Sequence, residues 1–118
     1  MFARPYVDRY TGSMILTKAS AKILCAFLDA PGREHYGFGL MRSTGVKSGS
    51  LYPILDRLRQ AGWVEVEDED IDEHAEGRPR RKLYRLTAVG ESAARHAVAG
   101  FFRDLGTAPS WIPNLEGA

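Results

Sequence analysis

Residues 47–61 read KSGSLYPILDRLRQA, and this stretch decides the fold. Its apolar residues recur at helical spacing, namely Leu51, Ile54, Leu55, Leu58 and Ala61. Side chains three or four residues apart lie on one face of an α-helix, so the stretch is predicted to be an amphipathic helix packed on a core. The remaining positions are mostly polar, so the outward face is predicted to carry groups that can donate hydrogen bonds.

Pro53 constrains where this helix begins, because a proline ring clashes with the carbonyl four residues earlier, that of Gly49. Either the regular helix starts near Ser50, with Pro53 in its first turn, or the first turn is distorted. Both alternatives are expected to leave the backbone amides of Ser48, Gly49 and Ser50 without partners inside the helix. Such amides at a helix N-terminus bind phosphate oxygens.

Two more helices are predicted on the N-terminal side. Thr17 is a suitable N-cap for the first, whose apolar residues recur at helical spacing until Pro31. The second is short, covers residues 36–43 and carries Phe38 among its apolar side chains. Gly45 then suits a left-handed turn into the next helix.

Two strands are predicted after the third helix, over residues 63–67 and 82–86, because apolar and charged side chains alternate there. The connection between them, residues 68–81, is too long for a tight hairpin and is expected to project as a flap. Opposite charges meet at Gly77, where a turn is expected. The sequence therefore predicts a two-stranded wing with a charged tip.

Thr87 is predicted to cap a last helix with an apolar stripe at the spacing of a helix–helix seam. The stripe consists of Ala94, Val98, Phe101 and Leu105. Two copies of the chain are expected to pair through this stripe. Their two third helices would then lie about 34 Å apart, which is the length of one turn of DNA. Phe101, Phe102 and Trp111 are a candidate effector site for a flat hydrophobic ligand, with plain dimer packing as the alternative.

The predicted fold class is mainly α with a small two-stranded β wing, in the element order of a winged helix-turn-helix followed by a dimerisation helix. Residues 14–86 would form the DNA-binding domain and residues 87–105 the dimerisation helix. Residues 1–13 are predicted to be an N-terminal arm, and residues 106–118 an irregular tail.

The composition fits one soluble domain. The chain has 118 residues, of which 44% are hydrophobic and 26% charged, unlike a disordered chain. Its longest apolar run, residues 23–28, is too short to span a membrane, and the first residues lack the apolar block of a secretory signal. Cys25 is the single cysteine. It is predicted to be a small buried residue rather than a redox sensor, in a reducing cytoplasm.

Charge is divided into blocks. Residues 1–63 hold nine Lys or Arg against four Asp or Glu, residues 64–76 hold eight acids and no Lys or Arg, and residues 78–85 hold five bases and no acid. The basic block either pairs with the acids across the hairpin or contacts DNA phosphates, and the charge pattern favours neither. We expect the acidic block to weaken non-specific attraction to DNA.

Several motifs follow one another along the chain: YGFGL at 36–40, SGSLYPILDRL at 48–58, AGWV at 61–64, GRPRRKLY at 77–84 and LTAVG at 86–90. Together they resemble the PadR family of bacterial transcriptional regulators over about residues 16–105. The resemblance implies a homodimeric repressor that binds an inverted-repeat operator and is released by a small ligand. The chain departs from the family pattern where YGFG replaces His-Gly-Tyr-Glu, and where Lys47 and Ser48 replace Ser-Pro.

The candidate DNA-binding residues form two groups. Ser48, Ser50 and Tyr52 are expected to reach base edges or nearby phosphates from the start of the third helix. The second group, expected mainly at phosphates or the minor groove, consists of Tyr36, Lys47, Arg57, Arg78, Arg80, Arg81 and Lys82. Two alternatives stay open: Tyr52 as a surface aromatic over the stem of Arg59, and Arg57 as an ordinary solvated residue.

An enzyme is not expected. The three histidines, His35, His74 and His96, lack metal-ligand spacing, and no nucleophile–base pattern or phosphate loop is present, so neither a metal nor a cofactor is predicted. The acidic run lacks the glycine and terminal glutamate of a calcium loop. The alternative function is a winged-helix module for protein–protein contact, without DNA binding.

Overall fold

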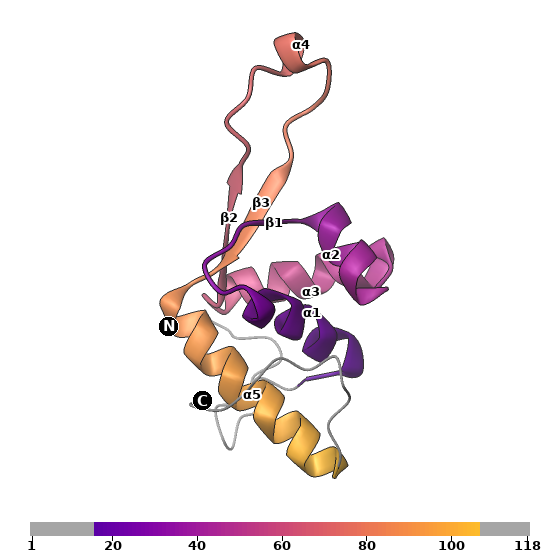
Figure 1. Cartoon of the computed structure of the whole chain (residues 1–118), viewed down its shortest axis with the longest axis vertical. Coiled ribbons are helices and arrows are strands. Elements are labelled where there is room, and N and C mark those ends of the chain that lie inside the picture. The colour runs from indigo at the N-terminus through magenta and orange to yellow at the C-terminus, as the bar shows by residue number, and fades with distance from the viewer. Residues whose placement is uncertain (1–15, 107–118) are drawn as a thin grey trace.

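The computed structural model describes residues 16–106 (Figure 1). In this range the elements are α1 (Lys18–Asp29), β1 (His35–Tyr36), α2 (Gly37–Thr44), α3 (Ser48–Gln60), β2 (Val64–Asp68), α4 (Glu73–Glu76), β3 (Lys82–Leu86) and α5 (Ala88–Leu105). The fold is mainly helical with a small antiparallel sheet, which confirms the predicted fold class. The predicted arm at residues 1–13 and most of the tail at 106–118 lie outside the described residues.

Helix α1 begins where the sequence predicts. The hydroxyl oxygen of Thr17 accepts a hydrogen bond from the amide of Ser20 at 3.1 Å, which satisfies one of the unpaired amides of the first turn. The helix is central to the fold: it lies between α3 and α5, and its buried face contacts both (Figure 1). Cys25 is buried on α1, as predicted, and burial raises the pKa of its thiol to about 12, so the thiol stays protonated and unreactive.

The turn between α2 and α3 is built around Gly45, which caps α2 with φ of +76°. That left-handed conformation is the one predicted for this glycine. The start of α2 differs from the prediction, because Tyr36 belongs to β1 and the helix begins at Gly37. Phe38, one of the apolar residues of this helix, is 65% exposed.

Helix α3 buries the predicted apolar face, with Leu51, Ile54, Leu55 and Leu58 in the core. Its start corrects the first of the two alternatives for Pro53, since the helix already begins at Ser48 and Pro53 lies inside it. The amide of Ser50 donates a hydrogen bond of 3.0 Å to the carbonyl of Lys47. The Ser50 amide therefore has a hydrogen-bond partner, whereas both alternatives had predicted that it would have none.

The sheet has the strand order β1-β3-β2, with both pairs antiparallel. Strands β2 and β3 form the predicted wing, in a register that pairs Val64 with Leu86 and Asp68 with Lys82. The two-residue strand β1 adds a third member at the other edge of β3, opposite Leu83 and Tyr84. The wing extends away from the helices (Figure 1).

The tip of the wing contains the short helix α4. The side chain of Asp72 caps it by accepting hydrogen bonds from the amides of His74 and Ala75. Gly77 ends it in the left-handed region with φ of +68°, at the position where the sequence predicts a turn. The acidic segment thus includes an N-capped helical turn.

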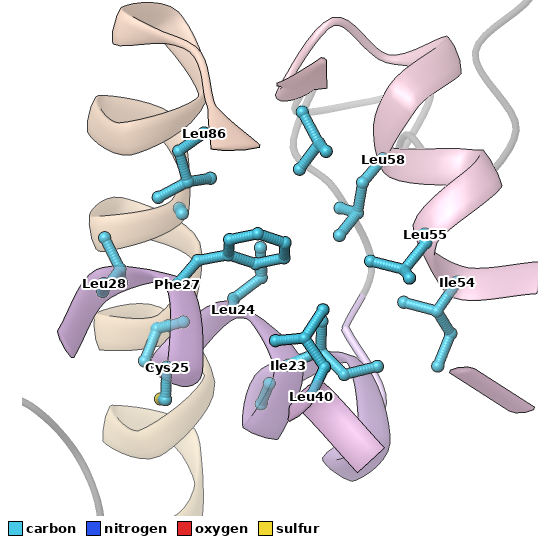
Figure 2. Packing of buried hydrophobic residues seen from close by; sticks show 14 of the residues in the cluster. Ile23, Leu24, Cys25, Phe27, Leu28, Leu40, Ile54, Leu55, Leu58 and Leu86 are labelled. Atoms are coloured by element: carbon cyan, nitrogen blue, oxygen red, sulfur yellow. The ribbon is translucent and has the colours of Figure 1, made fainter. Parts of the chain in front are cut away.

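Helix α5 covers the side of α1 that faces away from α3, and the core fills the space between the three helices (Figure 2). Phe27 and Leu24 of α1 point into this space, with Leu55 and Leu58 of α3 on its other side (Figure 2). Together with residues of α2 and the sheet, they form one continuous cluster of buried hydrophobic side chains.

The placement of α5 corrects part of the predicted dimer seam. Ala94 and Val98 have no exposed surface, because they pack on the core of their own chain. Phe101 is half-buried against the same cluster, and Leu105 is 58% exposed. The helical spacing of the stripe was correct, but its first two members are buried in the core of their own chain.

Candidate nucleic-acid interface

The outward face of α3 begins with exposed polar residues. Lys47, Ser48 and Ser50 are exposed at the helix start, and Tyr52 is 43% exposed one turn further on. Lys47 occupies the N-cap position without a side-chain hydrogen bond to the helix, so its ammonium group has no capping role. These four predicted residues therefore share one accessible helix end.

Tyr52 is held against the start of α2 by close packing on Gly37. A Cβ atom at Gly37 would lie within 2.8 Å of the Tyr52 ring, and closer still to its hydroxyl oxygen. Gly37 is buried, and any larger residue would displace the ring. The start of α2 thus constrains the position of the Tyr52 ring.

A groove of about 340 Å³ separates this end of α3 from the wing. It is lined by Tyr36, Gly37, Phe38, Tyr52, Arg80, Arg81, Lys82 and Tyr84. The guanidinium group of Arg81 lies over the Tyr36 ring, 5.2 Å from its centroid, in cation–π geometry. The structure thus brings together five of the predicted residues, Tyr36, Tyr52, Arg80, Arg81 and Lys82, in one aromatic and cationic groove.

Arg57 and Arg78 lie apart from this groove. Arg57 is half-buried and lines a cavity between α3 and the start of α1. The two terminal guanidinium nitrogens of Arg78, Nη1 and Nη2, donate to the carboxylate of Glu69, at 2.7 and 3.0 Å. Arg78 is therefore engaged within the wing.

Most wing cations pair with wing acids, as in the ion-pair alternative of the charge analysis, whereas the Arg81 guanidinium group lies over Tyr36. Besides Arg78 with Glu69, Arg80 lies 3.4 Å from Glu73, and Lys82 lies 3.1 Å from Asp68. The pairs differ in exposure: the Glu69 side chain is 12% exposed, whereas both partners in the other two pairs are 47% exposed or more. Exposed pairs contribute less than about 1 kcal/mol and exchange partners readily.

The sequence patterns did not reveal three residues of this region. Phe38 is exposed beside the groove with the Arg42 guanidinium 5.9 Å from its ring centroid, and the sequence had placed it only among the apolar residues of a short helix. Asp56 lies on the outward face of α3 and accepts hydrogen bonds from Arg59 and Gln60, at a spacing typical of helix side-chain pairs. Glu69 was treated as one of eight equivalent acids, and no local pattern distinguishes it.

The candidate effector residues do not form one site in the described part of the chain. Phe102 is 5% exposed and belongs to the core, which corrects its assignment to an open site. Its ring and that of Phe101 meet edge to face at 5.0 Å. Trp111 lies outside the described residues, so Phe101 is the one candidate among residues 16–106 that keeps partly exposed surface.

Neither a metal site nor a membrane span is found in residues 16–106. No group of three or more His, Cys, Asp or Glu side chains in this range has the geometry to hold a metal ion. None of the helices in the same range is both long enough and apolar enough to cross a membrane.

Three helices ending in an exposed reading helix, followed by a β hairpin that flanks it, define the winged helix-turn-helix class of transcriptional regulators. The family model of the Transcriptional regulator PadR-like family matches residues 33–96. The chain belongs to this family, whose members are regulators and not enzymes, in agreement with the predicted family and the prediction that the chain is not an enzyme.

Solved structures of two related kinds resemble the chain. Apo MarR from Escherichia coli is 25% identical with a TM-score of 0.60, over 87% of this chain and 67% of MarR. A cysteine-to-serine variant of MarR bound to operator DNA is likewise 25% identical, with a TM-score of 0.58, over 87% of this chain and 65% of that one. A PadR-like transcription factor from Bacteroides fragilis is 26% identical with a TM-score of 0.56, over 71% and 82%. No curated protein matches the chain significantly.

Proposed function

We propose that the protein is a transcriptional regulator of the cytoplasm that binds double-stranded DNA in a sequence-specific way. One observation carries the proposal: the exposed polar start of α3 lies beside a groove lined by Arg80, Arg81 and Lys82. In a winged helix the reading helix enters a major groove and the wing reaches the adjacent minor groove, so one phosphate backbone passes between them. A cationic groove at that place suits a phosphate backbone.

Each residue has a role that follows from its position. Ser48, Ser50 and Tyr52 reach base edges or the nearest phosphates from the end of α3, and Lys47 neutralises a phosphate there. Arg81, whose guanidinium group lies over Tyr36, contacts the phosphate backbone of the DNA in the groove. Arg57 lies on the side of α3 next to α1 and is proposed as a peripheral phosphate contact.

The exposed ion pairs of the wing fit this role. Arg80 and Lys82 are paired with carboxylates at the surface, where such pairs contribute less than about 1 kcal/mol. A DNA phosphate can replace the carboxylate of Glu73 or Asp68 at little cost. Arg78 is held by two charge-assisted hydrogen bonds to a largely buried carboxylate. Its main proposed role is therefore to stabilise the wing, and contact with the minor groove is secondary.

We further propose a homodimeric repressor on an inverted-repeat operator. A single α3 contacts too few base pairs for specific binding, and a twofold pair of chains doubles the contacts. The seam is assigned to the face of α5 that does not pack on α1, with Leu105 and the exposed part of Phe101 as its apolar residues. The bound operator of the MarR variant supports DNA as the partner.

Release by a small hydrophobic ligand is the last part of the proposal. Phe101 is its one described candidate residue with partly exposed aromatic surface, and Trp111 is the proposed reporter. Titration with planar aromatic compounds should change tryptophan fluorescence and lower operator affinity together. A fluorescence change without loss of DNA affinity would remove the effector role.

The test of DNA binding uses fluorescence anisotropy with duplexes from the promoters that flank the protein's own gene. We expect the logarithm of the affinity to fall linearly with the logarithm of salt concentration, because bound phosphates release counterions. Tyr52→Ala should weaken binding to the best duplex about tenfold or more. Arg103→Gln removes a cation from the last turn of α5, at the opposite end of the molecule from the wing, and should leave binding nearly unchanged (Figure 1).

A wild-type protein that binds none of these duplexes at low salt would contradict the proposal. That result would favour the alternative function, a winged-helix module for protein–protein contact. Equal affinity for promoter and random DNA, with no effect of Tyr52→Ala, would contradict sequence-specific reading by α3 while leaving electrostatic DNA binding in place.

A further inference from the structure

The carboxylate of Glu69 is the centre of a hydrogen-bonded cluster at the base of the wing tip. Its two oxygens accept the bidentate pair from Arg78, at 2.7 and 3.0 Å. Oε1 also accepts from the backbone amide of Arg81 at 3.3 Å, and Oε2 lies 3.5 Å from the hydroxyl of Tyr36, which donates to it. A side chain of the first arm of the wing thus contacts both the second arm and the strand β1.

The backbone reinforces this cluster. The amide of Glu69 donates to the carbonyl of Arg81 at 2.8 Å, so residues 69 and 81 are joined by a backbone and a side-chain hydrogen bond. Arg81 in turn places its guanidinium group over Tyr36. The Glu69 carboxylate therefore helps to fix the backbone of Arg81, whose side chain is one of the three cations that line the groove.

Glu69 differs from the other wing acids in its low exposure, its bidentate pair with Arg78 and its contact with Tyr36. The pair with Arg78 lowers the pKa of Glu69 to about 2, so the carboxylate is ionised throughout the physiological range. Glu73 pairs with the Arg80 guanidinium on the surface, at 3.4 Å, and accepts from the Arg80 backbone amide at 2.9 Å, but both side chains of this pair are about half exposed. Glu67, on β2, is exposed and has no hydrogen bond or ion pair from its side chain within residues 16–106.

We propose that Glu69 is a positioning residue for DNA binding: its carboxylate holds Arg81 and Tyr36 in the geometry that receives the phosphate backbone between α3 and the wing. This inference rests on the proposed DNA-binding function and deepens it. It reverses, for this one acid, the expectation that the acidic block only repels DNA. A negative charge in the wing then strengthens binding, because it orders the cation that touches the phosphate.

The sign of the effect makes the proposal testable. If Glu69 acts only as a negative charge near DNA, then Glu69→Gln should strengthen binding, as Glu67→Gln should, by removing repulsion. If Glu69 positions Arg81, then Glu69→Gln should weaken operator binding by about fivefold to tenfold, although the wing becomes less acidic. Glu73→Gln removes the charge that pairs with the Arg80 guanidinium, while the glutamine oxygen can still accept from the Arg80 amide, so it should strengthen binding about twofold to threefold.

The salt dependence separates positioning from a general loss of folded protein. Loss of one ordered phosphate contact should reduce the slope of log affinity against log salt by about 1. A reduced fraction of active protein would lower the apparent affinity without changing that slope. Glu69→Asp keeps the charge but shortens the reach, and it should weaken binding as Glu69→Gln does.

A second measurement needs no DNA. Trypsin cleaves after the exposed Arg80, Arg81 and Lys82 only when this segment leaves the wing. Glu69→Gln and Glu69→Asp should raise the initial cleavage rate in this segment, whereas Glu67→Gln should leave it at the wild-type value. Circular dichroism should confirm that the helices are unchanged.

Two results would overturn the proposal: tighter DNA binding by Glu69→Gln than by wild type, or wild-type affinity and slope in Glu69→Asp. These results differ from failure of the proposed function, in which the wild-type protein itself binds no duplex. In that case the trypsin measurement still decides whether Glu69 orders the wing, and an unchanged cleavage rate would refute even that part.

Discussion

The backbone of Gly90 lies directly against the carbonyl group of Trp63. A Cβ atom at Gly90 would overlap the Trp63 oxygen and come within 2.6 Å of its carbonyl carbon. This approach places the first turn of α5 on the start of β2. Thr87 completes the junction, since its hydroxyl donates to the carbonyl of Gly62 at 2.8 Å and its amide to that of Trp63 at 3.0 Å.

Gly90→Ala should therefore destabilise the protein, although alanine favours helices. We expect a loss of about 1–3 kcal/mol, the cost of forcing extra atoms into a packed contact. Gly100→Ala is the matched control in the same helix, because a Cβ atom added there would meet nothing within 4 Å, and it should stabilise the fold by up to about 1 kcal/mol. Urea unfolding measures both, and equal effects of the two substitutions would contradict the contact.

Gly37→Ala should act through Tyr52. In the wild-type background the new methyl group displaces the Tyr52 ring, and we expect a loss of about 1–2 kcal/mol in unfolding free energy. In a Tyr52→Ala background the same substitution meets empty space and should cost nearly nothing. A double-mutant cycle of the unfolding free energies checks this, and additivity would show that the two residues are independent.

The stability of the fold should fall as the pH drops through the range of histidine titration, because of His35. Burial is the main cause that lowers the pKa of His35 below its ordinary 6.5, and its Nε2 atom is buried without a hydrogen-bond partner in the described structure. The unfolded chain thus binds a proton before the folded chain does. The stability held above pH 6.5 is lost as the pH falls from there to the folded pKa.

Urea unfolding of wild type and His35→Leu across this range measures the effect. The wild-type curve should decline relative to the variant below pH 6.5, since leucine cannot bind the proton. Parallel curves for the two proteins would mean that His35 titrates alike in both states.

The Glu69–Arg78 pair should give Glu69 an unusual acid titration. Carbon-detected NMR should place the carboxyl midpoint near the pKa of about 2. Arg78→Gln should move this pKa up toward the ordinary glutamate value of 4.5, since the hydrogen bond from Arg78 is the largest cause of the depression. Because the pKa of Glu69 is lower in the folded chain than in the unfolded chain, this pair stabilises the fold above pH 4.5. That contribution is lost as the pH falls from 4.5 toward 2. A midpoint near 4.5 in the wild type would exclude the pair in solution.

The proposed dimer seam includes Leu105 of the apolar stripe on α5 but excludes Val98, which is buried in the core. Leu105→Asp changes an exposed residue, so the chain should stay folded but sediment as a monomer. Val98→Asp places a charge in the core, where an unpaired carboxylate costs several kcal/mol, so it should unfold the chain. A dimer that survives Leu105→Asp would place the seam elsewhere.

Most of the fold could be predicted from sequence because local signals agree with tertiary packing. The caps at Thr17 and Thr87, the left-handed glycines and the apolar face of α3 identified the helices and their ends. The strand β3 lies at the predicted residues 82–86. In these segments, periodicity and capping chemistry describe the same geometry, so nothing overrides them.

The rest depended on contacts between residues distant in sequence. Tyr36 leaves the predicted helix because it pairs with Leu83, far along the chain, and no local pattern records that pairing. Ala94 and Phe101 belong to one stripe by spacing, but the core of the same chain covers the first fully and the second in part. Glu69 stands among similar acids, and its role emerges only when Arg78, Arg81 and Tyr36 meet around it.

The junction of Thr87 and Gly90 with Gly62 and Trp63 leaves no pliable linker between the wing and α5. If two subunits associate through α5, the angle between the two α5 helices then sets the orientation of α3 and the wing in each subunit. Such a dimer would tolerate little variation in the number of base pairs between the two halves of its target.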